Sequence, residues 1–104
     1  MSTLTGKQKR FLRAEAHHMT PVFQIGKQGL NETIIDEYRL ALEKRELMKV
    51  SILQNASVTV KEAKEYIEGH SEIDVVQTIG HILVLYMPSE DEKYQNYSLK
   101  IKKL

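Results

Sequence analysis

The chain has 104 residues and a mass of 12.0 kDa, which is enough for one globular domain but not for two. It has no cysteine, and this excludes a disulfide framework, a thiolate zinc site, an iron–sulfur cluster and a cysteine nucleophile. The net charge is only +1, yet residues 1–29 carry five basic residues and one acidic residue. This basic first third indicates a local anion-binding face, to which a solvated helix surface is the alternative.

The first half of the chain predicts two helices with an extended segment between them. A helix begins near Gly6, after the capping-box pattern Thr5-x-x-Gln8, and ends at about residue 18. Residues 20–25 are extended, with Pro21 at a position where a missing N–H is tolerated, and residues 26–29 form a loop. Asn31 is placed to cap the next helix, whose apolar side chains recur at helical spacing.

The second half predicts three strands and one helix. Residues 47–53 are rich in apolar side chains and form a strand. The capping box Thr59-x-x-Glu62 opens a helix for which Gly69 is a candidate end. Residues 73–79 and 82–87 form two strands joined by Gly80-His81, which fits a type II′ hairpin. The order α-β-α-β-α-β-β predicts an α/β fold with a mostly parallel sheet and a terminal antiparallel pair.

The predicted domain spans residues 1–88, and residues 89–104 form a C-terminal tail. Apolar and polar side chains alternate over residues 97–102, so a late edge strand and a mobile basic tail are both open for this segment. The longest apolar stretch, residues 82–87, is too short to cross a bilayer, and the N-terminus does not resemble a secretory signal. We therefore expect a cytoplasmic protein with no membrane partner.

The segment Gly26-Lys27-Gln28-Gly29 is the strongest candidate for a binding site. Its glycines let the backbone approach a ligand closely, and the free N–H groups where the next helix begins, near Asn31, attract phosphate oxygens. Lys27 adds a positive charge that positions a ligand without reading its sequence. KH modules clamp a nucleic-acid backbone with a GxxG loop. The alternative is a turn that needs only a positive φ.

The basic residues of the first predicted helix support the binding interpretation. Four of them fall within about 100° of arc at 3.6 residues per turn: Lys9, Arg10, Arg13 and His17. The apolar residues lie mainly on the other side, which Gln8 and Glu15 interrupt. One face for packing and one cationic face for phosphates suit a protein that binds a nucleic-acid backbone.

No pattern in the chain indicates catalysis or a metal site. The four histidines lack metal-ligand spacing, and there is no nucleophile elbow, Walker loop or Rossmann fingerprint. Asp36-Glu37 and Glu43-Glu46 are expected to form a solvated helix face and not acid–base pairs. We therefore expect no enzyme activity, no cofactor and no small-molecule substrate.

Several spaced motifs over residues 3–88 resemble the CRM domain (chloroplast RNA splicing and ribosome maturation), and most closely its single-domain bacterial form, the YhbY-like RNA-binding proteins. The motifs are Leu4-Thr5-Gly6-Lys7-Gln8-Lys9-Arg10-Phe11-Leu12, Ala16-His17, Pro21, Ile25-Gly26-Lys27-Gln28-Gly29-Leu30, Glu46-Leu47-Met48-Lys49-Val50, Gln77-Thr78-Ile79-Gly80 and Leu83-Val84-Leu85-Tyr86. Two positions depart from the family pattern. Gln28 stands where a small residue is frequent, and Met87 stands where a basic residue is frequent.

The resemblance implies a two-layer α/β sandwich with a four-stranded mixed sheet, similar to the C-terminal domain of bacterial translation initiation factor three. It also implies RNA binding through the loop and the basic helix, including Lys7, and association with precursors of the large ribosomal subunit. The predicted RNA-binding residues are Gly26, Lys27, Gln28, Gly29, Lys7, Lys9, Arg10, Arg13, His17 and Asn31.

The sequence thus predicts a non-enzymatic RNA-binding protein that contacts rRNA phosphates during assembly of the large ribosomal subunit. The main alternative is a protein-interaction adaptor that docks on ribosomal or other proteins through its sheet or its acidic middle segment, residues 30–99, which carry seven basic and thirteen acidic residues. RNA binding would then be incidental. A small enzyme acting on nucleic acid is a third possibility, for which the chain offers no metal cluster or nucleophile.

Overall fold

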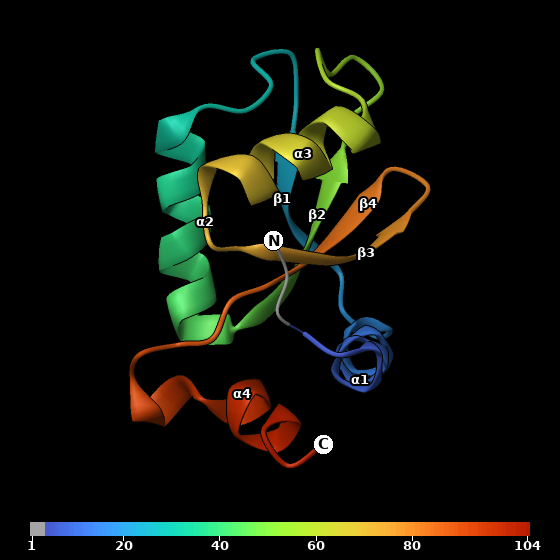
Figure 1. Ribbon diagram of the computed structural model, residues 1–104. Coiled ribbons are helices and arrows are strands. Elements are labelled where there is room, and N and C mark those ends of the chain that lie inside the picture. The colour runs from blue at the N-terminus through green and yellow to red at the C-terminus, as the bar shows by residue number, and fades with distance from the viewer. Residues whose placement is uncertain (1–3) are drawn as a thin grey trace.

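The computed structural model describes residues 4–104 as one four-stranded sheet with helices on both faces (Figure 1). Residues 1–3, which the predicted domain includes, lie outside the described part. The elements in chain order are α1 (Gly6–Ala16), β1 (Pro21–Ile25), α2 (Glu32–Arg45), β2 (Leu47–Ile52), α3 (Val60–His70), β3 (Asp74–Ile79), β4 (Ile82–Tyr86), the 3₁₀ turn η1 (Glu92–Tyr94) and α4 (Asn96–Ile101). The predicted mixed α/β class and four-stranded sheet are confirmed.

The strands lie in the order β1-β2-β4-β3. Only β1 and β2 are parallel, because β4 lies between β2 and β3 and is antiparallel to both. The expectation of a mostly parallel sheet is therefore wrong. Strand β4 is buried over most of its length, whereas β3 and β1 expose several residues. Strand β4, which is more buried than β1 or β3, therefore lies in the interior of the sheet, where helices cover both of its faces.

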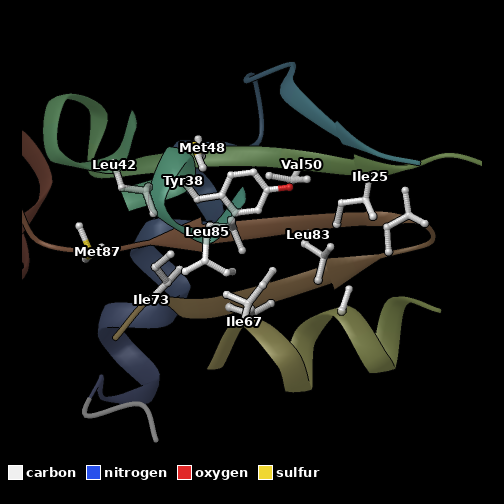
Figure 2. Close-up of a cluster of buried hydrophobic side chains, with 14 residues drawn as sticks. Ile25, Tyr38, Leu42, Met48, Val50, Ile67, Ile73, Leu83, Leu85 and Met87 are labelled. Carbon is white, nitrogen blue, oxygen red and sulfur yellow. The ribbon is translucent and has the colours of Figure 1, made fainter. Parts of the chain in front are cut away.

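The sheet is the middle layer of three, and not one of two layers. The cluster under α2 and α3 includes Tyr38, Ile67 and Val50, and Figure 2 shows side chains from the sheet and both helices pointing toward one another. A second cluster on the opposite face joins Leu12 of α1 to Val84 of β4. Strand β2 supplies residues to both clusters, which explains its nearly continuous apolar run.

Local signals in the sequence predicted where the helices begin. The capping boxes at Thr5 and Thr59 both form, and the Asn31 carboxamide oxygen accepts the Ile34 N–H at 2.9 Å. Helix α3 runs through Gly69 to His70, one residue past its predicted end. Gly80 has a φ of 57°, as the first position of the expected hairpin turn requires. None of the helices within residues 4–104 is both long and apolar enough to span a membrane.

Residues 96–101 form helix α4 instead of the expected edge strand or mobile tail. Helix α4 is held in place by Gln8 and Glu15, the two polar residues that interrupt the apolar side of α1. The Gln8 side chain donates from Nε2 to the carbonyl oxygen of Ile101 at 3.0 Å, and Glu15 Oε1 lies 3.9 Å from Lys100 Nζ. Buried Ile101 adds α4 to the second core cluster, so this segment completes the face that α1 covers.

Two acidic residues near the end of α2 hold the C-terminal segment by its backbone. The buried Glu46 carboxylate accepts the N–H groups of Ser89, Tyr97 and Ser98 at 2.7, 2.8 and 3.1 Å. Glu43 Oε1 accepts from the Ser89 hydroxyl and from the backbone of residues 90 and 91. The expectation of a solvated face is therefore wrong for Glu43 and Glu46, because their partners come from a segment more than forty residues later in the chain.

Candidate nucleic-acid interface

The loop between β1 and α2 is a tight turn with an open tip. The N–H of Gly29 donates to the carbonyl oxygen of Gly26 at 2.9 Å, which closes the turn. The side chains of Lys27 and Gln28 at the tip are exposed. The GxxG segment therefore presents its two central residues to solvent and to any ligand that approaches this end of the molecule.

The two glycines of this loop have different roles. Gly29 has a φ of 66° and is buried, and a Cβ there would lie 2.7 Å from the Ser57 hydroxyl oxygen. Gly26 has no positive φ, and a Cβ there would meet only the Leu53 side chain at 3.7 Å, an ordinary contact. The packing of the loop against residues 57 and 58 therefore requires glycine at Gly29, whereas nothing within the described chain requires it at Gly26.

Gly29→Ala is expected to lower the free energy of unfolding by about 1–3 kcal/mol, because alanine is strained at this φ and its methyl group clashes with Ser57. Gly26→Ala is the matched control, with an expected change within about 0.5 kcal/mol. Urea denaturation followed by circular dichroism measures both values. Equal stability of the two variants would show that the conformation of the loop is not constrained as described.

The loop and the start of α2 offer unused backbone donors. Within residues 4–104, no acceptor receives the N–H groups of Lys27, Gln28, Glu32 or Thr33. Such groups at a helix N-terminus attract anions. The Asn31 side chain accepts the Ile34 N–H and so caps the helix. Asn31 therefore positions this turn, and the groups left to donate to a ligand are backbone N–H groups. The Glu32 carboxylate in the first turn opposes an approaching anion, which makes the charge of Lys27 more important.

The predicted basic residues of α1 form an exposed cationic surface. The side chains of Lys7, Arg10, Arg13 and His17 are exposed, and Lys9 is partly buried. Lys9, Arg13 and His17 are spaced four apart along the helix, and together with Lys7 and Arg10 they are called the basic row of α1. Among the ion pairs of residues 4–104, none involves a cation of α1, whereas Arg39, Lys64 and Lys100 each have a carboxylate partner. This surface therefore carries net positive charge that the described chain does not neutralise.

The structure does not bring the loop and α1 together in one patch. Figure 1 places the loop beyond the carboxyl end of β1 and α1 near the opposite end of that strand. Helix α1 packs on β2, β3 and β4 instead. The predicted residues thus form two separate groups, the GxxG loop and the basic row of α1, on a molecule whose longest extent is 40 Å.

A further cation, which is not among the predicted RNA-binding residues, lies beside the basic row. Lys49 on β2 lines a depression together with Arg13 and Ala14 of α1, the C-cap residue His17, and Gln77 and Ile79 of β3. Lys49 is the one charged residue within β2, where it interrupts a run of apolar side chains. A charge inside a buried strand is unusual, and this was the signal in the sequence that could have identified it.

Acidic side chains gather at a different place. Five carboxylate residues line a depression beside α2 and the start of β3: Asp36, Glu43, Glu72, Asp74 and Glu90. Leu40, with 71% of its surface exposed, lies in the same lining. Arg39 lies in the same lining and pairs with Asp36 and Glu72, and the lining shares no residue with the loop or with the basic row.

Comparison with known proteins gives consistent matches over nearly the whole chain. The family model of the CRS1 / YhbY (CRM) domain matches residues 4–87. The chain is 51% identical over 90 residues to the probable RNA-binding protein YqeI of Bacillus subtilis, a match that covers 86% of this chain and 94% of that protein. It is 44% identical over 95 residues to an RNA-binding protein of Haemophilus influenzae, covering 91% and 96% of the two chains.

A solved structure agrees with these matches. The solution structure of the hypothetical protein SAV1595 of Staphylococcus aureus is similar to the fold described above, with a TM-score of 0.66 and 46% sequence identity. The match covers 86% of this chain and 94% of that one.

Proposed function

Because this chain belongs to the CRS1 / YhbY (CRM) domain family, we propose that it is an RNA-binding protein whose GxxG loop and basic α1 row contact rRNA phosphates. Its relatives of Bacillus subtilis and Haemophilus influenzae are named as RNA-binding proteins and are matched over nearly their full length. We further propose a non-catalytic role on precursors of the large ribosomal subunit, as the family resemblance implies. Such a role would place the protein in the cytoplasm.

The open tip of the loop is the observation that carries this proposal. It combines an exposed lysine, Lys27, with backbone N–H groups that no acceptor within residues 4–104 occupies. A phosphate group is an anion with several acceptor oxygens, and it suits both features at once. Gln28 is exposed beside Lys27 and is available to donate or accept a further hydrogen bond.

The separation of the two groups determines how RNA would lie on the protein. An RNA that touches both must extend from the loop at one end of β1 to α1 at the other. The protein would then hold the RNA backbone at two places and would make few contacts that depend on the base sequence. We therefore propose recognition of an extended or irregular RNA segment, whose affinity depends strongly on salt concentration.

Lys27→Ala is expected to weaken binding to a single-stranded RNA and to reduce the slope of log K against log salt by about 0.7, the value for one phosphate contact. The thermal midpoint should not change, because the side chain is exposed and makes no ion pair in the described chain. Fluorescence anisotropy over a series of salt concentrations measures the slope. Lys93→Ala, an exposed lysine on η1, is the control and should leave the slope close to that of the wild type.

The biological target requires a measurement in cells. Crosslinking of the tagged protein to RNA, followed by sequencing, should enrich one region of rRNA, and the protein should sediment with immature large subunits. An even distribution over all RNA would contradict the ribosomal role while leaving RNA binding intact.

The adaptor alternative has its own supporting observation, the acidic depression with the exposed Leu40 side chain. It predicts that the purified protein ignores RNA at modest salt and keeps a protein partner after nuclease treatment. Loss of the partner on nuclease treatment would support RNA as the primary ligand.

A further inference from the structure

Lys49 occupies an unusual electrostatic position. Only 9% of its surface is exposed, and its Nζ lies 3.5 Å from the carbonyl oxygen of His17, at the long limit of a hydrogen bond. No carboxylate within residues 4–104 pairs with it. Buried lysines are rare unless they are paired, because removing an ammonium group from water is costly. The site therefore has a buried positive charge and lacks an anion.

The surroundings of Lys49 form a small, open binding surface. The depression has a volume of about 370 Å³, and besides Lys49 it is lined by Arg13, His17, Gln77 and Ile79. Lys49 and Gln77 flank Val84 on neighbouring strands, so they lie on the same face of the sheet. Ile79 exposes 50% of its surface at the rim. The depression therefore combines the cations Lys49 and Arg13 with the amide of Gln77 and the apolar side chain of Ile79.

We propose that this depression binds one unpaired RNA nucleotide, with its phosphate on Lys49 and Arg13 and its base against Ile79 and Gln77. The inference rests on the proposed RNA-binding function and makes it more specific. A phosphate supplies the anion that Lys49 lacks, and an amide can pair with the exposed edge of a base. A base held in a duplex is stacked and paired, and so it cannot enter the depression. The site therefore selects single-stranded RNA.

The proposal separates the role of Lys49 in binding from its role in folding. If the ammonium serves a ligand, its replacement by methionine removes an unpaired charge from a largely buried side chain and leaves the packing of the aliphatic stem intact. Lys49→Met is then expected to have a thermal midpoint equal to or above that of the wild type. If Lys49 instead stabilised the fold through its contact with the His17 carbonyl, its replacement would lower the thermal midpoint.

The test uses the full chain with a fluorescent single-stranded oligouridylate and an RNA duplex of the same length. Lys49→Met is expected to bind the single strand about tenfold more weakly, the loss of one charge-assisted hydrogen bond. Ile79→Ser replaces an exposed side chain, so it should fold normally, and it is expected to weaken binding of the single strand while leaving binding of the duplex unchanged. Lys93→Met is the control for a lost charge and should bind both RNAs as the wild type does.

The outcomes distinguish this site from the wider function. If the wild type binds neither RNA, the proposed function itself is wrong. If the wild type binds and both Lys49→Met and Ile79→Ser bind equally well, the nucleotide site alone is overturned. Competition by uridine monophosphate but not by inorganic phosphate at the same concentration supports a base contact. Equal competition by the two would overturn the base contact.

Discussion

Glu46→Ala is expected to lower the free energy of unfolding by about 3 kcal/mol or more. The carboxylate of Glu46 is fully buried and accepts the backbone N–H groups of Ser89, Tyr97 and Ser98, so alanine would leave three donors without their acceptor. Each buried group left unsatisfied costs about 1–3 kcal/mol. Burial raises the pKa of the neighbouring Tyr86 hydroxyl, and the carboxylates of Glu46 and Asp74 raise it further.

Urea denaturation of the variant measures this loss, and two comparisons locate its origin. Glu43 is only partly buried, so Glu43→Ala is expected to cost less than Glu46→Ala. Hydrogen exchange should show that the amides of Tyr97 and Ser98 lose protection in Glu46→Ala before those of the sheet do. A Glu46→Ala protein as stable as the wild type, with α4 still protected, would contradict the role given to Glu46.

Removal of cations from both groups is expected to cause the largest loss of RNA affinity. The combined variant Lys27→Ala, Arg10→Ala and Arg13→Ala removes three charges at two separate places, and we expect a loss of about 100-fold at moderate salt. Because the loop and α1 lie at opposite ends of β1, the free-energy losses of Lys27→Ala and of the Arg10→Ala, Arg13→Ala pair should add on a long RNA.

The length of the RNA provides the control for this result. On an oligonucleotide too short to reach from the loop to α1, adding the second set of substitutions should have a smaller effect than on a long RNA. Anisotropy titrations with both lengths measure this difference, and thermal midpoints confirm that the variants fold. Additive losses on the short RNA would contradict the view that one strand spans the two groups.

The features that the sequence predicted correctly are those that depend on neighbouring residues. Thr5 and Thr59 begin capping boxes, and Asn31 caps α2, because each hydrogen bond joins residues three apart in the chain. Of the three apolar residues whose alternation favoured an edge strand, Tyr97 and Ile101 are four apart and also fit one face of a short helix, on which Leu99 is left exposed. Periodicity could not decide between them, since the contacts of α4 are made with Glu46 and α1, which are distant in the sequence.

The candidate site was predicted in its parts but not in its arrangement. The exposed loop tip and the cationic row of α1 were identified from residue types and helical spacing. Their separation depends on the crossing of α1 over β2, β3 and β4, which no local pattern encodes. Lys49 was missed because it was taken as part of an apolar strand, and the structure was needed to show that its side chain is buried next to α1 without a carboxylate partner in the described chain.

Titration of the isotope-labelled protein with single-stranded RNA, followed by the amide resonances of each residue, shows which surface binds RNA. We expect the amides of Lys27, Gln28, Glu32 and Thr33 to shift first and together with those of the basic row of α1, since their N–H groups would donate to phosphate oxygens or lie beside the bound RNA backbone. Shifts confined to the acidic depression around Leu40, with the loop amides unmoved at saturating RNA, would contradict this expectation.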